Sequence, residues 1–280
     1  MRYSLQVPVL IVFLILFQAC STDAIENETV LADQKYGSLP EQNYDIYLPE
    51  NRTSETPVII LVHGGFWVYG DKSDMNSLVT MAKTLAPDYA VVNMNYRLAN
   101  ANSNHYPVQL EDISLLIEDL ESKKASYHIS NNYYFIGVSA GGHLSLLYAY
   151  KEDIAHNIKA VCSIVGPTDF LDPYYHGSDV LFFQSIMLPF LGYTYEEDPK
   201  LYQDASPKFY VDQWDAPTIL FYGDKDELVP LSQATRLVDK LIISNVPYEF
   251  NILTDTGHDL TEINDYEVGL KIAAFFNAHK

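Results

Sequence analysis

The residue with the clearest chemical potential is a serine flanked by glycines, in the run Gly137-Val138-Ser139-Ala140-Gly141-Gly142. The run follows a β-type stretch at 133–136 and precedes a helical pattern at 143–150, so the serine is expected on a sharp strand-to-helix turn. Such a turn favours glycines, because a side chain at either flanking position would clash with nearby backbone. A hydroxyl presented in this way is typical of a nucleophile in acyl transfer.

Three further motifs could complete that chemistry, and each follows a strand-like run. The stretch His63-Gly64-Gly65-Phe66-Trp67 would expose backbone N–H groups suited to a developing oxyanion. Asp224 and Asp226 lie in one loop, and His258 follows the next strand-like run. Donor loop, serine, acid and histidine occur in the order that an α/β-hydrolase topology requires.

These motifs resemble the α/β-hydrolase superfamily, in the carboxylesterase and lipase-like branch that includes feruloyl and acetyl carbohydrate esterases. The resemblance extends from about residue 44 to the C-terminus. It rests on HGGFW at 63–67, YRL at 96–98, YP at 106–107 followed by Asp112, GVSAGGH at 137–143, GPTD at 166–169, ASP at 205–207, GDKDELVP at 223–230 and GH at 257–258.

The resemblance implies a catalytic triad of Ser139, Asp226 and His258. Strand alternation alone leaves Asp224 and Asp226 as rivals, and the family pattern G-x-x-D-x-x-V-P favours Asp226. Ser139 would attack an ester carbonyl while His258 accepts its proton, and Asp226 would hold the imidazole in the productive tautomer.

The oxyanion of the tetrahedral intermediate would be held by backbone N–H groups of Gly65, Phe66 and Ala140. Phe66 and Trp67 would either form one wall of the substrate pocket or support the loop, and the sequence favours neither. Phe66 also stands where many lipase-like relatives have a third glycine. His63 is expected to orient the oxyanion loop rather than act as a base.

Three functions fit these motifs. The first is a serine hydrolase of carboxylic esters, including acetyl or feruloyl esters of carbohydrates. The second is an arylformamidase, because an HGG-x-W pattern also occurs there. The third is a surface binding protein that uses a hydrolase fold without turnover, although such a protein would not need the serine, the acid and the histidine together.

Composition limits the partners and cofactors. The chain has 280 residues, 48% of them hydrophobic, which suits one α/β domain. Its formal net charge of −20 disfavours binding to nucleic acid or anionic lipid. No HExxH motif, Cys/His cluster or nucleotide-type phosphate loop occurs, so neither metal nor cofactor is expected. The expected partner is a small-molecule or carbohydrate ester, and the oligomeric state stays open.

The first residues have the pattern of an export signal. Arg2 precedes an apolar run at 7–17 that is too short to span a bilayer, and Cys20 follows a small residue. We expect a signal peptide at 1–19, a lipid on Cys20 and a tether at 20–40, giving an extracytoplasmic lipoprotein anchored to the membrane. The alternative is a plain secreted or periplasmic protein with one spare cysteine.

The remaining sequence alternates between strand and helix patterns. Strands are expected near 44–48, 58–62, 89–94, 133–138, 159–165, 217–222 and 248–253, and helical periodicity appears around 110–120, 231–243 and 265–276. This order predicts an α/β-hydrolase domain at 41–280 with a mostly parallel sheet covered by helices on both faces. A stretch without strands, about 167–214, is expected to insert a cap that either shapes the pocket or merely packs on the domain.

Overall fold

The computed structural model describes residues 27–175, 181–258 and 266–280. The predicted signal peptide at 1–19 and the lipidation site Cys20 lie outside the described residues. Within the described part of the chain, no helix is long and apolar enough to cross a membrane.

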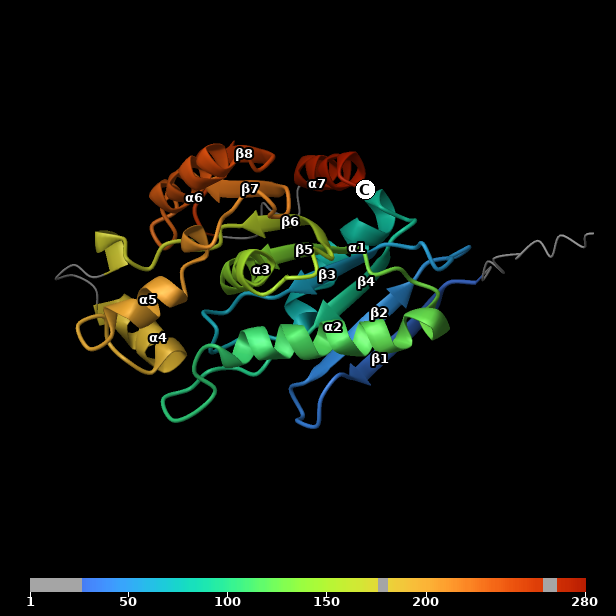
Figure 1. The fold of residues 1–280 in the computed structure, drawn as a ribbon, viewed down its shortest axis with the longest axis horizontal. Helices are drawn as coiled ribbons and strands as arrows, with labels where there is room; N and C mark the ends of the chain where they lie inside the picture. Colours follow the sequence, from blue (N-terminus) through green and yellow to red (C-terminus); the bar gives the residue numbers. More distant parts are fainter. Residues whose placement is uncertain (1–26, 176–180, 259–265) are drawn as a thin grey trace, which may run out of the picture.

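A single eight-stranded sheet forms the centre of the fold (Figure 1). Its strand order is β1-β2-β4-β3-β5-β6-β7-β8, with β1, β2 and β4 paired antiparallel and all other neighbours parallel. The strands are β1 (Thr29–Lys35), β2 (Asn43–Leu48), β3 (Val58–Val62), β4 (Ala90–Met94), β5 (Tyr133–Val138), β6 (Ile158–Ile164), β7 (Thr218–Gly223) and β8 (Tyr248–Leu253). The seven strands expected from the sequence are therefore confirmed within about one residue at each end.

Helices cover both faces of the sheet, as the alternating pattern predicted (Figure 1). The α-helices are α1 (Asn76–Leu85), α2 (Val108–Tyr127), α3 (Ala140–Lys151), α4 (Leu181–Leu191), α5 (Pro199–Asp204), α6 (Leu231–Ser244) and α7 (Tyr266–Ala278). Short 3-10 helices span Lys72–Met75, Pro173–Tyr175 and Pro207–Phe209.

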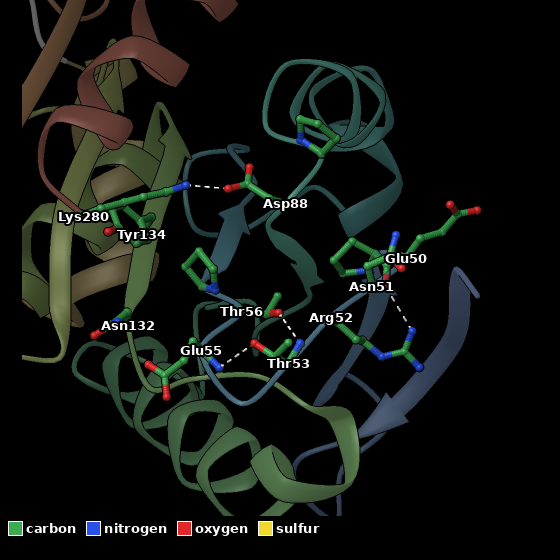
Figure 2. A pocket seen from close by; sticks show the side chains of 13 residues that line it. Glu50, Asn51, Arg52, Thr53, Glu55, Thr56, Asp88, Asn132, Tyr134 and Lys280 are labelled. Atoms are coloured by element: carbon green, nitrogen blue, oxygen red, sulfur yellow. Dashed lines mark hydrogen bonds and ion pairs between the residues drawn. The ribbon is translucent and has the colours of Figure 1, made fainter. Parts of the chain in front are cut away.

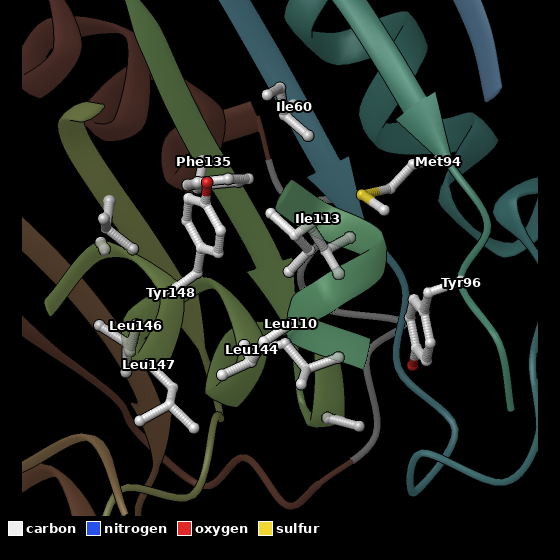
Figure 3. Packing of buried hydrophobic residues seen from close by; sticks show 14 of the residues in the cluster. Ile60, Met94, Tyr96, Leu110, Ile113, Phe135, Leu144, Leu146, Leu147 and Tyr148 are labelled. Atoms are coloured by element: carbon white, nitrogen blue, oxygen red, sulfur yellow. The ribbon is translucent and has the colours of Figure 1, made fainter. Parts of the chain in front are cut away.

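Alternation along the strands divides the apolar core into two layers. On β3, Val58, Ile60 and Val62 join the cluster that contains α2, α3 and α6, whereas Ile59 and Leu61 join the cluster of α1 and α7. Figure 3 shows the first layer, where Ile60 and Phe135 of the sheet meet Leu110 and Ile113 of α2. Because successive strand side chains point to opposite faces, a strand buried on both sides must be apolar throughout, as β3 is.

The strand β1 corrects one prediction. The tether expected at 20–40 is wrong for Thr29–Lys35, which pairs with β2 at the sheet edge. Its side chains are mostly exposed or half-buried, so the sequence lacks the apolar alternation that marks a buried strand. The ladder and an ion pair hold it instead, because the buried Lys72 contacts Asp33 of β1 at 2.7 Å and Asp45 of β2 at 2.5 Å.

The stretch at 167–214 contains no strand among its described residues and carries α4 and α5. Figure 1 places these helices beyond the end of the sheet at which α3 begins. That is the carboxyl end of the parallel strands, where ligands bind in open α/β sheets.

Candidate active site

Ser139 occupies a strained turn between β5 and α3. Its backbone adopts φ 52° and ψ −116°, outside the regions usually open to a residue with a side chain. The amide of Ser139 donates to the Ile164 carbonyl at 2.8 Å, which ties the turn to β6. A Cβ atom at Gly137 would collide with the Gly141 carbonyl, and one at Gly141 would collide with the Val62 carbonyl. Close backbone packing therefore explains the flanking glycines.

The three residues of the predicted triad lie in one hydrogen-bonded row. The Oγ of Ser139 is 3.1 Å from Nε2 of His258, and Nδ1 of His258 is 2.7 Å from Oδ2 of Asp226. An ionised carboxylate can only accept a hydrogen bond, so Nδ1 of His258 carries the proton. Nε2 is then free to accept the proton of the serine hydroxyl. This is the arrangement required of a nucleophile, its base and an orienting acid.

Asp226, rather than Asp224, contacts the histidine. The second oxygen of Asp226, Oδ1, accepts hydrogen bonds from the amides of Leu228 and Val229 at 2.8 Å each. These bonds fix the carboxylate plane toward the imidazole. Within the described ranges, Oδ1 of Asp224 is buried without a hydrogen-bond partner. The ambiguity that the sequence pattern left is therefore resolved in the geometry.

Backbone donors face no competing acceptor near Ser139. Gly65 and Phe66 have φ values of 104° and 54°, and the Gly65 carbonyl accepts from the amides of Val68 and Tyr69 to close the turn. No hydrogen bond between described residues uses the N–H groups of Gly65, Phe66 or Ala140. Ala140 is the first residue of α3, where helix amides lack intrahelical partners. All three predicted donors are thus available to a developing oxyanion.

His63 supports this loop and is not placed as a base. Its Nδ1–H donates to the Gly64 carbonyl at 2.7 Å, and its ring stacks on Tyr96 with 4.2 Å between centroids. The side chain is 1% exposed, and burial lowers its pKa below the usual value. A neutral, stacked imidazole that bonds the neighbouring carbonyl orients the backbone, as the sequence led us to expect.

His143 links three parts of the site. Trp67 Nε1–H donates to His143 Nδ1 at 3.1 Å, and His143 Nε2–H donates to the Ala205 carbonyl at 2.7 Å. Trp67 also stacks on Phe190 of α4 with 4.3 Å between ring centroids. The fully buried histidine therefore fixes the oxyanion loop against α3 and the 167–214 stretch. The sequence does not reveal these contacts, because the position after the glycine pair gives no information about the partners of the imidazole.

This buried histidine should make the protein less stable in acid. Burial lowers the pKa of His143 from 6.5 to about 4, so the unfolded chain binds a proton between those values that the folded protein does not. The free energy of unfolding should therefore fall as pH drops from 6.5 to 4, by about 3 kcal/mol for this group. Urea titrations across this range should show a shallower pH dependence in His143→Gln. An equally steep curve in that variant would assign the effect to other groups.

An apolar pocket adjoins the serine. Besides Ser139 itself, its walls include Phe66, Trp67, Phe170, Phe183, Met187 and Val229. The free space is about 20 Å³, enough for a group of the size of one water molecule or methyl. Phe66 and Trp67 therefore form a pocket wall, and Trp67 also supports the loop. The sequence did not reveal the other walls, because the apolar run at 181–191 does not show which side chains turn inward.

A larger hollow lies at the other end of the sheet (Figure 2). Its volume is about 560 Å³, and it is lined by residues that precede β3, β4 and β5, among them Pro57, Asp88 and Asn132. Its two cationic side chains are engaged, since Lys280 pairs with Asp88 at 2.5 Å and Arg52 donates to the Asn27 and Pro49 carbonyls. None of the predicted site residues lines this hollow. Choosing the candidate active site by cavity volume alone would therefore select the end of the sheet opposite Ser139.

Cys162 is part of the apolar core of the sheet. The cysteine is fully buried in β6, and burial raises the pKa of its thiol, as suits inert packing. Across residues 27–175, 181–258 and 266–280, no three or more His, Cys, Asp or Glu side chains are grouped to hold a metal ion.

Comparison with known proteins places this chain in a family. Residues 44–241 match the family model described as BD-FAE. The chain belongs to the BD-FAE family. Among curated relatives of this BD-FAE protein, Esterase LipC of Mycobacterium tuberculosis is 25% identical over 86% of the chain, and kynurenine formamidase of Danio rerio is 26% identical over 50% of it. The chain spans only 63% of LipC and 46% of the formamidase.

Solved structures confirm the fold of this BD-FAE chain. A truncated carbohydrate esterase from gut microbiota superimposes with a TM-score of 0.77 at 22% identity, covering 90% of the chain and 96% of that protein. MGS-M1, an alpha/beta hydrolase enzyme from a deep-sea metagenome, gives a TM-score of 0.64 at 19% identity, covering 91% and 96%. The predicted α/β-hydrolase fold is therefore correct.

Proposed function

We propose that this protein is a serine hydrolase that cleaves carboxylic esters through an acyl-enzyme on Ser139. The observation that carries the proposal is the continuous row from Ser139 through His258 to Asp226, with distances of 3.1 and 2.7 Å. The esterase among the relatives supports the same reaction type.

The reaction follows from this geometry. His258 Nε2 accepts the proton of Ser139 as Oγ attacks the carbonyl carbon, and the amides of Gly65, Phe66 and Ala140 hold the oxyanion. The histidine then gives its proton to the departing alcohol. Water then attacks the carbonyl of the acyl-enzyme, with the same proton transfers through His258. This step releases the carboxylic acid and regenerates the Ser139 hydroxyl.

The narrow apolar pocket supports a short acyl group. Space of about 20 Å³ between Trp67, Phe170 and Met187 accommodates the methyl of an acetyl group. A feruloyl group would not fit there without displacing these side chains, which lie against the packed core. Of the two carbohydrate esters expected from the sequence, we therefore propose acetyl esters.

A series of 4-nitrophenyl esters tests this proposal. We expect kcat/KM to be highest for acetate and to fall at least tenfold by hexanoate, because each added methylene must be placed in an occupied pocket. Met187→Ala, which enlarges the pocket, should restore part of the activity on the longer esters. Activity that rises from acetate to hexanoate in the parent protein would contradict the short-acyl proposal. Absence of hydrolysis across the series would contradict the esterase itself.

An arylformamidase is the second candidate. The formyl group is smaller than acetyl and also fits the pocket, and the kynurenine formamidase among the relatives supports the possibility. The two candidates differ in the bond cleaved, so N-formylkynurenine assayed beside an acetyl ester separates them. A kcat/KM at least tenfold higher for the formamide would favour the second candidate.

We also propose that the protein is a lipoprotein anchored outside the cytoplasm. Arg2, the apolar run at 7–17 and Cys20 support this localisation. In a bacterial host, Cys20→Ser should abolish incorporation of labelled palmitate and move the protein from the membrane to the soluble fraction. An unchanged distribution without any labelling of the parent would favour plain secretion.

A further inference from the structure

A second, wider groove adjoins the acyl pocket. It has a volume of about 470 Å³ and opens to solvent between α4 and the loops that follow β3 and β4. Its lining is mostly apolar, with Phe66, Tyr69, Phe182 and Ile186 among the larger side chains, and it includes the polar residues Asn100 and Ser185. Its volume is within the range of small-molecule sites, in contrast to the pocket of about 20 Å³ beside it.

The groove adjoins the pocket that contains Ser139. Phe66 and Ile186 line both spaces, so they form the boundary between them. The ring of Phe66 also contacts Phe182 edge to face, with 6.0 Å between centroids. A substrate whose carbonyl lies at Ser139 can therefore place its small acyl group on one side of Phe66 and its alcohol on the other.

Helix α4 divides its side chains between these two spaces. Met187 and Phe183 face the acyl pocket, whereas Phe182 and Ser185 face the groove. Phe182 is 51% exposed and, on the opposite wall, Tyr69 is 70% exposed. Large aromatic side chains left open beside a candidate active site indicate a binding surface.

Polar groups lie beside these aromatic rings. Asn100 uses one N–H of its amide to reach Ser103, and the Ser185 hydroxyl donates to the Phe182 carbonyl, so both keep hydrogen-bonding capacity. A sugar ring has an apolar C–H face and a rim of hydroxyls, which suits open aromatic rings bordered by polar groups. The formal charge of −20 disfavours anionic sugars.

We propose that this groove binds the alcohol part of the substrate as a neutral oligosaccharide, whose rings stack on Tyr69 and Phe182. This inference rests on the proposed ester hydrolysis, because the groove then holds the alcohol that departs as the acyl-enzyme forms. The binding itself does not require turnover and can be measured separately.

Titration with xylotetraose, a neutral β-1,4-linked oligosaccharide without an ester, tests the groove directly. Calorimetry should show saturable binding to the full-length protein. Tyr69→Ala and Phe182→Ala should each raise Kd about tenfold, since each removes one stacking surface worth about that factor. Trp214→Ala is the matched control, because Trp214 is also 70% exposed but lies before β7 at the far end of the sheet. It should leave Kd unchanged. An oligogalacturonate of equal length should not bind.

The possible results distinguish a wrong assignment of the groove from a wrong assignment of the reaction. Ester hydrolysis without xylotetraose binding, or equal Kd values in the parent and both groove variants, would overturn the groove assignment alone. Xylotetraose binding that depends on Tyr69 and Phe182 in a protein without hydrolase activity would keep the groove and overturn the proposed reaction. If Phe182→Ala weakens hydrolysis of 4-nitrophenyl octanoate and leaves sugar binding intact, the groove holds an alkyl chain and the proposal is wrong.

Discussion

Replacing Ser139 with alanine is expected to lower kcat for acetyl ester hydrolysis by about 10⁵-fold or more, with little change in KM. The variant loses the hydroxyl oxygen that lies 3.1 Å from His258 Nε2, so no acyl-enzyme can form on residue 139. The amides of Gly65, Phe66 and Ala140 remain, and they can still stabilise attack by water to a small extent. Single-turnover and steady-state assays with 4-nitrophenyl acetate measure the loss.

Ser145→Ala provides the matched control for this prediction. Ser145 lies further along α3 and is fully buried, and its hydroxyl has no hydrogen-bond partner within the described part of the chain. Removing it should therefore leave kcat and the melting temperature nearly unchanged. A fluorophosphonate probe should label the parent and Ser145→Ala but not Ser139→Ala. If the folded parent is not labelled, the chain would be better explained as a binding protein on a hydrolase fold.

The sequence predicted the site because its chemistry is concentrated at strand ends. Ser139, Asp226 and His258 follow β5, β7 and β8, which are parallel strands of one sheet. Carboxyl ends of parallel strands meet at a single edge, so residues far apart in sequence are brought together by topology alone. The role of the glycines that flank Ser139 could also be predicted from the sequence, since only glycine fits where backbone segments pack this closely.

Other features depend on packing that periodicity does not encode. The edge strand β1 has few buried side chains, and its ion pair with Lys72 joins residues about forty positions apart. Helix α4 is apolar on nearly every side, so its sequence could not indicate that Met187 would narrow the acyl pocket while Phe182 opens onto the groove. The bond from Trp67 to His143 likewise depends on how the oxyanion loop meets α3.

Asp226→Asn should lower kcat by about 10⁴-fold while leaving the fold intact. The carboxylate accepts from His258 Nδ1–H at 2.7 Å and from two backbone amides, which fixes both its position and the histidine tautomer. An amide that keeps its oxygen on the two backbone donors must turn its N–H₂ group toward Nδ1. That arrangement favours the tautomer with the proton on Nε2, which cannot accept from Ser139.

Asp224→Asn is the neighbouring control and should retain nearly full activity, because Asp224 does not contact the histidine and its Oδ1 has no partner among described residues. The two variants carry the same change in charge two residues apart, so a general electrostatic effect would reduce both rates alike. A loss confined to Asp226→Asn requires a directional hydrogen bond to His258. Comparable losses in both variants would mean that the negative charge of the loop matters and that the triad geometry does not.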